Sequence, residues 1–136
     1  MKKPKTGLSV RFWHPNKDFG FLSSALGLKC ERSWIAGSPR QTPIGKPLPG
    51  TYSESYWVST LHFPSTSGFR KKFVSMLRRL KKAEKICRDI KESGGTIELY
   101  LWLPGSVNIG DTIESSLLNE MVKLGVDLSI EVMPGV

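Results

Sequence analysis

Residues 69–92 read FRKKFVSMLRRLKKAEKICRDIKE. Apolar side chains recur in this stretch at spacings of three and four residues, the pattern of one buried helix face. These side chains are Phe69, Phe73, Met76, Leu77, Leu80, Ala83, Cys87 and Ile90. The stretch therefore predicts one long helix, with Ser67 as its N-cap and Gly94-Gly95 as its end.

The other positions of this predicted helix are strongly basic. Residues 69–92 carry ten Lys and Arg against three Asp and Glu, a net charge of +7 out of +8 for the whole chain. Residues 94–136 carry one Lys and six Asp and Glu, a net charge of −5. This asymmetry favours either an oriented partner or charge pairing within the chain.

Outward from the helix, the sequence predicts four strands and two shorter helices. Alternation of apolar and polar residues, which is typical of half-buried strands, occurs at residues 8–13, 54–63, 97–103 and 128–132. Helices are predicted at 19–26, with Asp18 as N-cap and Gly27 at the end, and at 111–124, with Asp111 near the start and Gly125 at the end. We expect an α+β fold: a four-stranded sheet with helices packed on one face and a long Pro/Gly-rich loop.

The long loop is expected at residues 29–52, which hold four prolines and three glycines, with one extended piece at 32–35. A chain of 136 residues with 39% hydrophobic and 24% charged residues has the size and composition of one folded domain. We expect a single domain over 1–136, with a basic N-terminal tail at 1–6.

Period-two alternation also predicts what the other face of the sheet carries. If Leu8, Val10 and Phe12 face the helices, together with the apolar residues of 97–103 and 128–132, then the opposite face carries Arg11, Trp13, Glu98, Tyr100, Trp102 and Glu131. The strand at 54–63 adds Tyr56, Val58 and His62, or else Trp57, Leu61 and Phe63. Aromatic and charged residues mixed in this way are typical of a protein-binding surface or of a base-stacking platform. Alternatively, the loop at 29–52 covers this face.

Four short motifs resemble those of a family of short bacterial proteins known only as a domain of unknown function. The motifs are FWHP at 12–15, LGL at 26–28, RSWIAGSPR at 32–40 and YW at 56–57. The resemblance spans nearly the whole chain and implies an α+β domain without an established enzymatic activity. It also implies a role in binding, since some relatives look like immunity proteins encoded beside bacterial toxins. The corresponding positions are Trp34, Gly37, Arg40 and Trp57.

The residues that carry chemistry do not form a recognisable catalytic or metal site. His14 and His62 are the only histidines, and Cys30 and Cys87 the only cysteines, and neither pair has zinc-site spacing. Ser33 lies in no nucleophile motif, and the loop glycines lack phosphate-loop spacing. We expect no enzyme, no cofactor and no metal. No signal peptide or membrane span is predicted, so a cytoplasmic protein is expected.

We therefore expect a protein-binding module, in its specific form an immunity protein that inhibits a cognate toxin by occlusion. The candidate partner-binding residues are Arg11, Trp13, Trp34, Arg40, Tyr100, Trp102, Arg78, Arg79 and Lys82. Arg40 would bind a partner's carboxylate or hold the loop to Glu54 or Glu98. The alternative function is non-specific nucleic-acid binding through the basic helix at 69–92, although Glu98 and Glu131 would repel phosphate.

Overall fold

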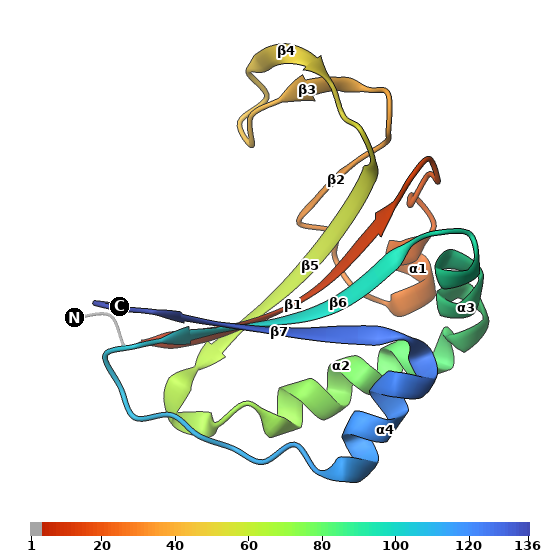
Figure 1. The fold of residues 1–136 in the computed structure, drawn as a ribbon. Coiled ribbons are helices and arrows are strands. Elements are labelled where there is room, and N and C mark those ends of the chain that lie inside the picture. The colour runs from red at the N-terminus through yellow and green to blue at the C-terminus, as the bar shows by residue number, and fades with distance from the viewer. Residues whose placement is uncertain (1–3) are drawn as a thin grey trace.

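A five-stranded mixed sheet runs through the computed structural model, which describes residues 4–136 (Figure 1). The strand order is β2-β5-β1-β6-β7, antiparallel throughout except for the parallel pair β6–β7. The strands are β1 (Lys5–His14), β2 (Arg32–Trp34), β5 (Ser55–Pro64), β6 (Thr96–Pro104) and β7 (Val126–Met133). The α+β class is confirmed, but the sheet has one strand more than predicted.

The additional strand comes from the predicted long loop. Arg32–Trp34 pairs with β5, and a separate hairpin follows, made of β3 (Pro39–Gln41) and β4 (Pro47–Thr51). The extended piece predicted at 32–35 is thus confirmed as β2, whereas the strands β3 and β4, whose backbone groups pair with one another, were not predicted. Figure 1 shows this hairpin projecting from the sheet on the side away from the helices.

The helices α1 (Leu22–Leu26), α2 (Arg70–Lys82), α3 (Glu84–Glu92) and α4 (Ser115–Leu124) lie together on one face of the sheet (Figure 1). Between them and the sheet lies the core, to which β1 contributes three fully buried side chains: Leu8, Val10 and Phe12. Phe12 pairs with Trp57 across the sheet, so Trp57 also faces the core and is 1% exposed. Consequently Tyr56, Val58 and His62 lie on the opposite face, which decides between the two alternatives for this strand.

The basic segment does not form the single helix that its apolar spacing predicts. The backbone leaves helical geometry at Ala83, where φ is −100° and ψ is 29°, and this residue separates α2 from α3. On both sides of the bend the predicted apolar stripe is buried, apart from the half-buried Phe69. The spacing therefore identified the buried face of both helices but not the change of direction between them.

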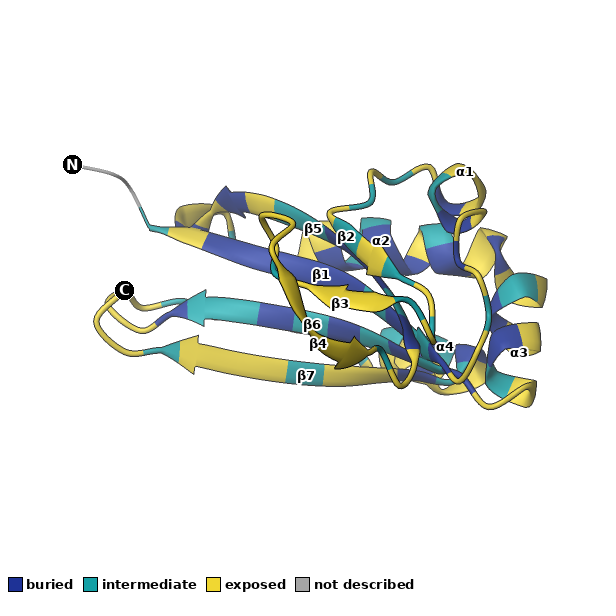
Figure 2. Ribbon diagram, turned by 90° about the horizontal axis from the view of Figure 1, so that it is seen from above, coloured by how far each residue is buried: buried dark blue, intermediate teal, exposed yellow. Residues whose placement is uncertain are grey.

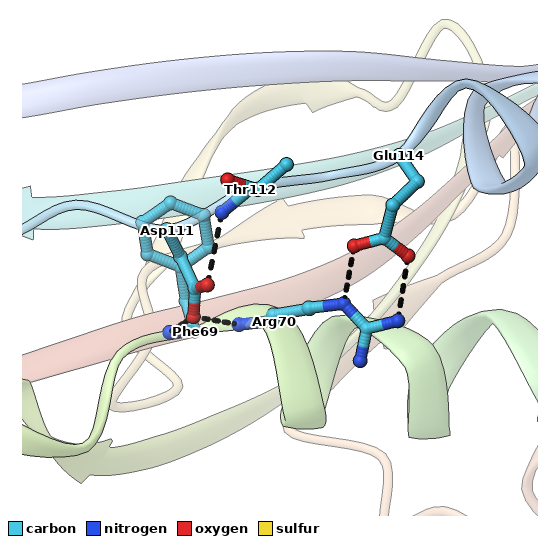
Figure 3. A network of polar contacts seen from close by, with 5 residues as sticks. All are labelled: Phe69, Arg70, Asp111, Thr112 and Glu114. Carbon is cyan, nitrogen blue, oxygen red and sulfur yellow. Dashed lines mark hydrogen bonds and ion pairs between the residues drawn. The ribbon is translucent and has the colours of Figure 1, made fainter.

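Asp111 was expected near the start of a helix at 111–124, and Ser67 at the cap of the basic helix. Instead α4 begins at Ser115, and Ser67 lies in a short 3-10 helix (Ser65–Ser67). Figure 3 shows that Asp111 closes the N-terminus of α2, since its Oδ2 accepts the backbone N–H groups of Phe69 (3.1 Å) and Arg70 (2.9 Å). The Arg70 side chain binds Glu114 through both carboxylate oxygens.

The apolar residues of β7 are less buried than predicted. Leu128, Ile130 and Val132 pair with Leu99, Leu101 and Leu103, so they lie on the helix side of the sheet. Nevertheless they are 37%, 59% and 56% exposed, because β7 is an edge strand that α4 covers only in part. Of the basic tail predicted at 1–6, residues 1–3 lie outside the described residues, and Lys5 and Thr6 belong to β1.

Candidate docking surface on the open sheet face

The sheet face opposite the helices carries four of the nine predicted site residues. Alternation along the three central strands brings a mixed set of polar, charged and aromatic side chains onto this face. The set comprises Ser9, Arg11 and Trp13 from β1, Tyr56, Thr60 and His62 from β5, and Glu98, Tyr100 and Trp102 from β6. Of the nine predicted binding residues, Arg11, Trp13, Tyr100 and Trp102 therefore share one face.

An aromatic cluster covers one end of this face. Trp34, from β2, stacks on Tyr52 at 4.3 Å between ring centroids and 7° between planes, and lies 4.7 Å from Tyr56. Tyr56 in turn lies 5.3 Å from Trp13. Trp34 also donates its Nε1–H to the Glu54 carbonyl at 3.0 Å. The expected covering by residues 29–52 thus applies to the Trp13 end, where Trp34 attaches the loop to the sheet.

The other end of the face is open and forms a groove of about 1050 Å³. Its walls are Thr60 and His62 on one side and Tyr100 and Trp102 on the other. Its floor is β1, where Gly7 pairs with both His62 and Trp102. A Cβ atom at Gly7 would lie at ordinary contact distance, 3.7 Å, from both His62 Nδ1 and Trp102 Cβ, so a side chain there would occupy part of the groove between them.

Charged groups on the open face pair with one another. The Arg11 guanidinium lies 3.9 Å over the Tyr100 ring, and its Nη1 lies 3.6 Å from Glu98 Oε1. Ser129 donates to Glu98 Oε2 at 2.6 Å, and the Tyr100 hydroxyl donates to Glu131 Oε1 at 2.6 Å. Burial, reinforced by the Glu131 carboxylate, raises the pKa of Tyr100, so its hydroxyl remains a neutral donor. The groove thus combines an aromatic lining with paired charged groups and carries little unbalanced charge.

The predicted basic residues lie on the other side of the sheet and do not act alike. Arg79 donates from Nη1 to the carbonyl oxygens of Leu26 and Gly27, both at 3.0 Å, and so closes the C-terminus of α1. Arg78 and Lys82 are exposed and line a hollow of about 390 Å³ beside α1. Elsewhere on α2, Lys81 lies 3.3 Å from Glu120 of α4. Internal contacts therefore take up part of the basic charge.

Arg40 does not hold the loop to Glu54 or Glu98, and its other expected role, binding a partner's carboxylate, stays a prediction. It is exposed on the β3–β4 hairpin, and its Nη1 donates to the Pro49 carbonyl at 3.3 Å rather than to Glu54 or Glu98. Arg32 is not among the nine predicted residues. Its guanidinium lies 4.9 Å over the Trp34 ring and donates to the Gln41 carbonyl at 2.9 Å. Gly7 was missed as well, although a glycine inside an alternating strand signals a close approach.

Comparisons with known proteins leave the resemblance a prediction, because no family model, no curated protein and no solved structure matches the chain. Within residues 4–136, no cluster of three or more His, Cys, Asp or Glu side chains is arranged to hold a metal ion. None of the helices in that part of the chain has the length and apolar character needed to cross a membrane.

Proposed function

We propose that this chain is a protein-binding module whose docking surface is the groove on the open sheet face. The observation that carries the proposal is the composition of that groove, in which Trp102, Tyr100 and Arg11 surround a floor with no side chain at Gly7. Trp, Tyr and Arg are the residues that most often dominate the binding energy of protein interfaces. The side chains of Arg11 and Tyr100 are held by their contacts with Glu98 and Glu131, so these two residues need little ordering on binding.

The partner that fits this groove is a protruding loop of another protein, which inserts an apolar or aromatic side chain over Gly7. The β5 and β6 walls stand about 10 Å apart, two strand spacings, which admits one side chain between His62 and Trp102. Glu31 and Glu131 balance Lys5 and Arg11 along the groove, so it offers a phosphate backbone no net positive charge.

In its specific form, the proposed module is an immunity protein that occludes the active site of a cognate toxin. The family resemblance supports this form. The exposed cations of α2, among them Lys71, Lys72, Arg78 and Lys82, lie on the helix side of the sheet, so they do not contribute to docking at the groove. The proposed binding requires no catalytic residue in this chain.

A pull-down from the native cell, divided into nuclease-treated and untreated halves, tests the proposal. We expect a stoichiometric protein that survives the nuclease treatment. Replacing Trp102 by Ala should then weaken the complex by about 30-fold, because a central anchor contributes on the order of 2 kcal/mol. The circular dichroism spectrum should not change, since Trp102 is only partly buried. Phe21→Ala, which truncates an exposed aromatic side chain outside the groove, is the matched control.

Two results would contradict the proposal. In the first, the eluate contains nucleic acid and is empty after nuclease treatment, and an Arg78→Glu/Lys82→Glu variant captures nothing. This result would establish the alternative function, in which α2 binds the nucleic-acid backbone. The second is a protein complex that Trp102→Ala leaves intact, which would place the docking surface elsewhere on the molecule.

A further inference from the structure

The strand β7 forms an edge of the sheet, and its only charged side chains are Asp127 and Glu131. It pairs with β6 continuously from Val126 to Met133, without a bulge, and within residues 4–136 no strand pairs with its other side. Natural edge strands are usually blunted by Lys, Pro or a bulge. The sequence of β7, VDLSIEVM, has neither Lys nor Pro. Of its two carboxylates, Glu131 is turned to the open face by the Tyr100 hydroxyl.

Apolar side chains lie along the helix side of this free edge. Figure 2 shows β7 exposed along most of its length, whereas β1 is mostly buried. In α4, Glu120 pairs with Lys81 and so marks the flank next to α2. At 100° per residue, Leu118 and Val122 lie on the opposite flank, toward the free edge of β7. They are 43% and 76% exposed. We define the β7 edge patch as Leu118, Val122, Leu128, Ile130 and Val132.

We propose that a second copy of this chain occupies the β7 edge patch. The two β7 strands would pair antiparallel around a two-fold axis at Ile130 and join the two sheets into one of ten strands. An exposed, contiguous apolar patch beside unpaired backbone groups is typical of an interaction site. Pairing with the same strand of a second copy satisfies those backbone groups and covers the aliphatic side chains of both copies at once.

The sequence of β7 is complementary to itself at this register. In a two-fold antiparallel pair, residues opposite each other must lie on the same face of the sheet. The axis therefore lies midway between one residue and the same residue of the second copy. An axis at Ser129 would place Asp127 opposite Glu131 twice, and an axis at Glu131 would oppose two carboxylates. With the axis at Ile130, Leu128 lies opposite Val132, Ile130 opposite its own copy, and Glu131 opposite Ser129. This register matches all three aliphatic pairs and opposes no like charges.

Sedimentation velocity over a range of concentrations tests whether the dimer forms. The expected particle has about twice the chain mass of 15.2 kDa. Ile130→Lys would place two ammonium groups at the axis and should weaken dimerisation at least ~10-fold, a ratio that corresponds to one unfavourable contact of about 1.4 kcal/mol. Its circular dichroism should match that of the wild type, because Ile130 is 59% exposed. Ile44→Lys, at an 80% exposed position of the hairpin, is the matched control and should remain dimeric.

Cross-linking tests the register in a Cys30→Ser background, which removes the more accessible of the two native thiols. Ile130→Cys places two thiols opposite each other with Cα atoms about 4.5–5.5 Å apart, so mild oxidation should give a disulfide dimer. Leu128→Cys, on the same face but opposite Val132 of the second copy, should not link to itself. A chain that stays monomeric at its highest soluble concentration would overturn the proposal. So would a dimer insensitive to Ile130→Lys, or one linked through Leu128→Cys instead.

Discussion

At the scale of single residues, Asp111 explains where α2 begins. A helix N-terminus leaves backbone N–H groups without partners, and in α2 no nearby side chain satisfies them. Asp111 accepts two of them from a segment that follows β6, and Gly68 makes room for it: with φ at +68°, a Cβ there would lie 2.5 Å from Asp111 Oδ2. The N–H groups, that of Arg70 above all, hold the pKa of Asp111 below its usual value of 3.8.

Substitution of Asp111 should therefore destabilise the protein in a pH-dependent way. We expect Asp111→Ala to lower the free energy of unfolding more than Asp111→Asn, which keeps an acceptor oxygen. Because the pKa is lowered in the folded state, the carboxylate's contribution is complete above pH 3.8 and is lost as the pH falls below this value. Urea titrations of wild type and Asp111→Asn at neutral and acidic pH measure the difference, which should shrink in acid. A difference that grows in acid would contradict this assignment.

At the scale of elements, the helices α2 and α3 are held by their apolar stripe. Leu80 is fully buried within it, whereas Lys82, two residues later, is exposed and makes no ion pair within the described residues. Lys82 therefore contributes little to the fold, unlike Arg70, Arg79 and Lys81, which contact other elements. The sequence of this segment predicts correctly which of its residues are buried and which are exposed.

Truncation within the stripe should have a far larger effect than truncation beside it. Leu80→Ala is expected to lower the free energy of unfolding by about 2–5 kcal/mol, since it removes buried methyl groups and leaves a cavity. Lys82→Ala, the control on the same helix, should change it by less than ~0.5 kcal/mol. Chemical denaturation followed by tryptophan fluorescence measures both. Equal effects of the two substitutions would mean that the charges contribute to stability as much as the packing does.

The elements that the sequence predicts best are those whose periodicity is long and regular. The alternation in β1, β5 and β6 identifies both the strands and their faces, which is why Trp13, Tyr100 and Trp102 could be assigned to the open face. A three-residue strand such as β3 has no period to detect, and the bend at Ala83 carries no glycine or proline signal. The remaining features depend on tertiary contacts that have no local sequence signal. Arg79 of α2 closes the C-terminus of α1, and the exposure of β7 follows from the position of α4.

At the scale of the whole molecule, the β3–β4 hairpin is an appendage to the sheet. Residues 39–51 contribute nothing to the hydrophobic core, and their flanking residues are already in contact, since Tyr52 N donates to the Ser38 carbonyl at 3.0 Å. The segment can therefore be shortened without moving β2 or β5. Its projection on the open-face side also makes it a candidate second wall for a bound partner (Figure 1).

Replacement of Pro39–Thr51 by two glycines should leave a cooperatively folding protein. We expect the free energy of unfolding to change by less than about 1 kcal/mol, because only exposed contacts are lost. Thermal unfolding followed by circular dichroism measures the change. Trp34→Ala, which removes the stack between Tyr52 and Tyr56, is the comparison and should cost more. Loss of cooperative unfolding on removal of the hairpin would show that it supports the sheet.

Because β1 lies in the middle of the sheet, the sheet cannot be completed until strands that are synthesised much later have emerged from the ribosome. This strand leaves the ribosome first, yet one of its two neighbours, β6, ends only at Pro104, 90 residues after β1 ends at His14. At 5–20 residues per second, this gap lasts roughly 5–20 s. Until then one edge of β1 stays unpaired, with Leu8, Val10 and Phe12 only partly covered. The nascent chain is therefore most exposed to aggregation, and most in need of a chaperone, before its last two strands emerge.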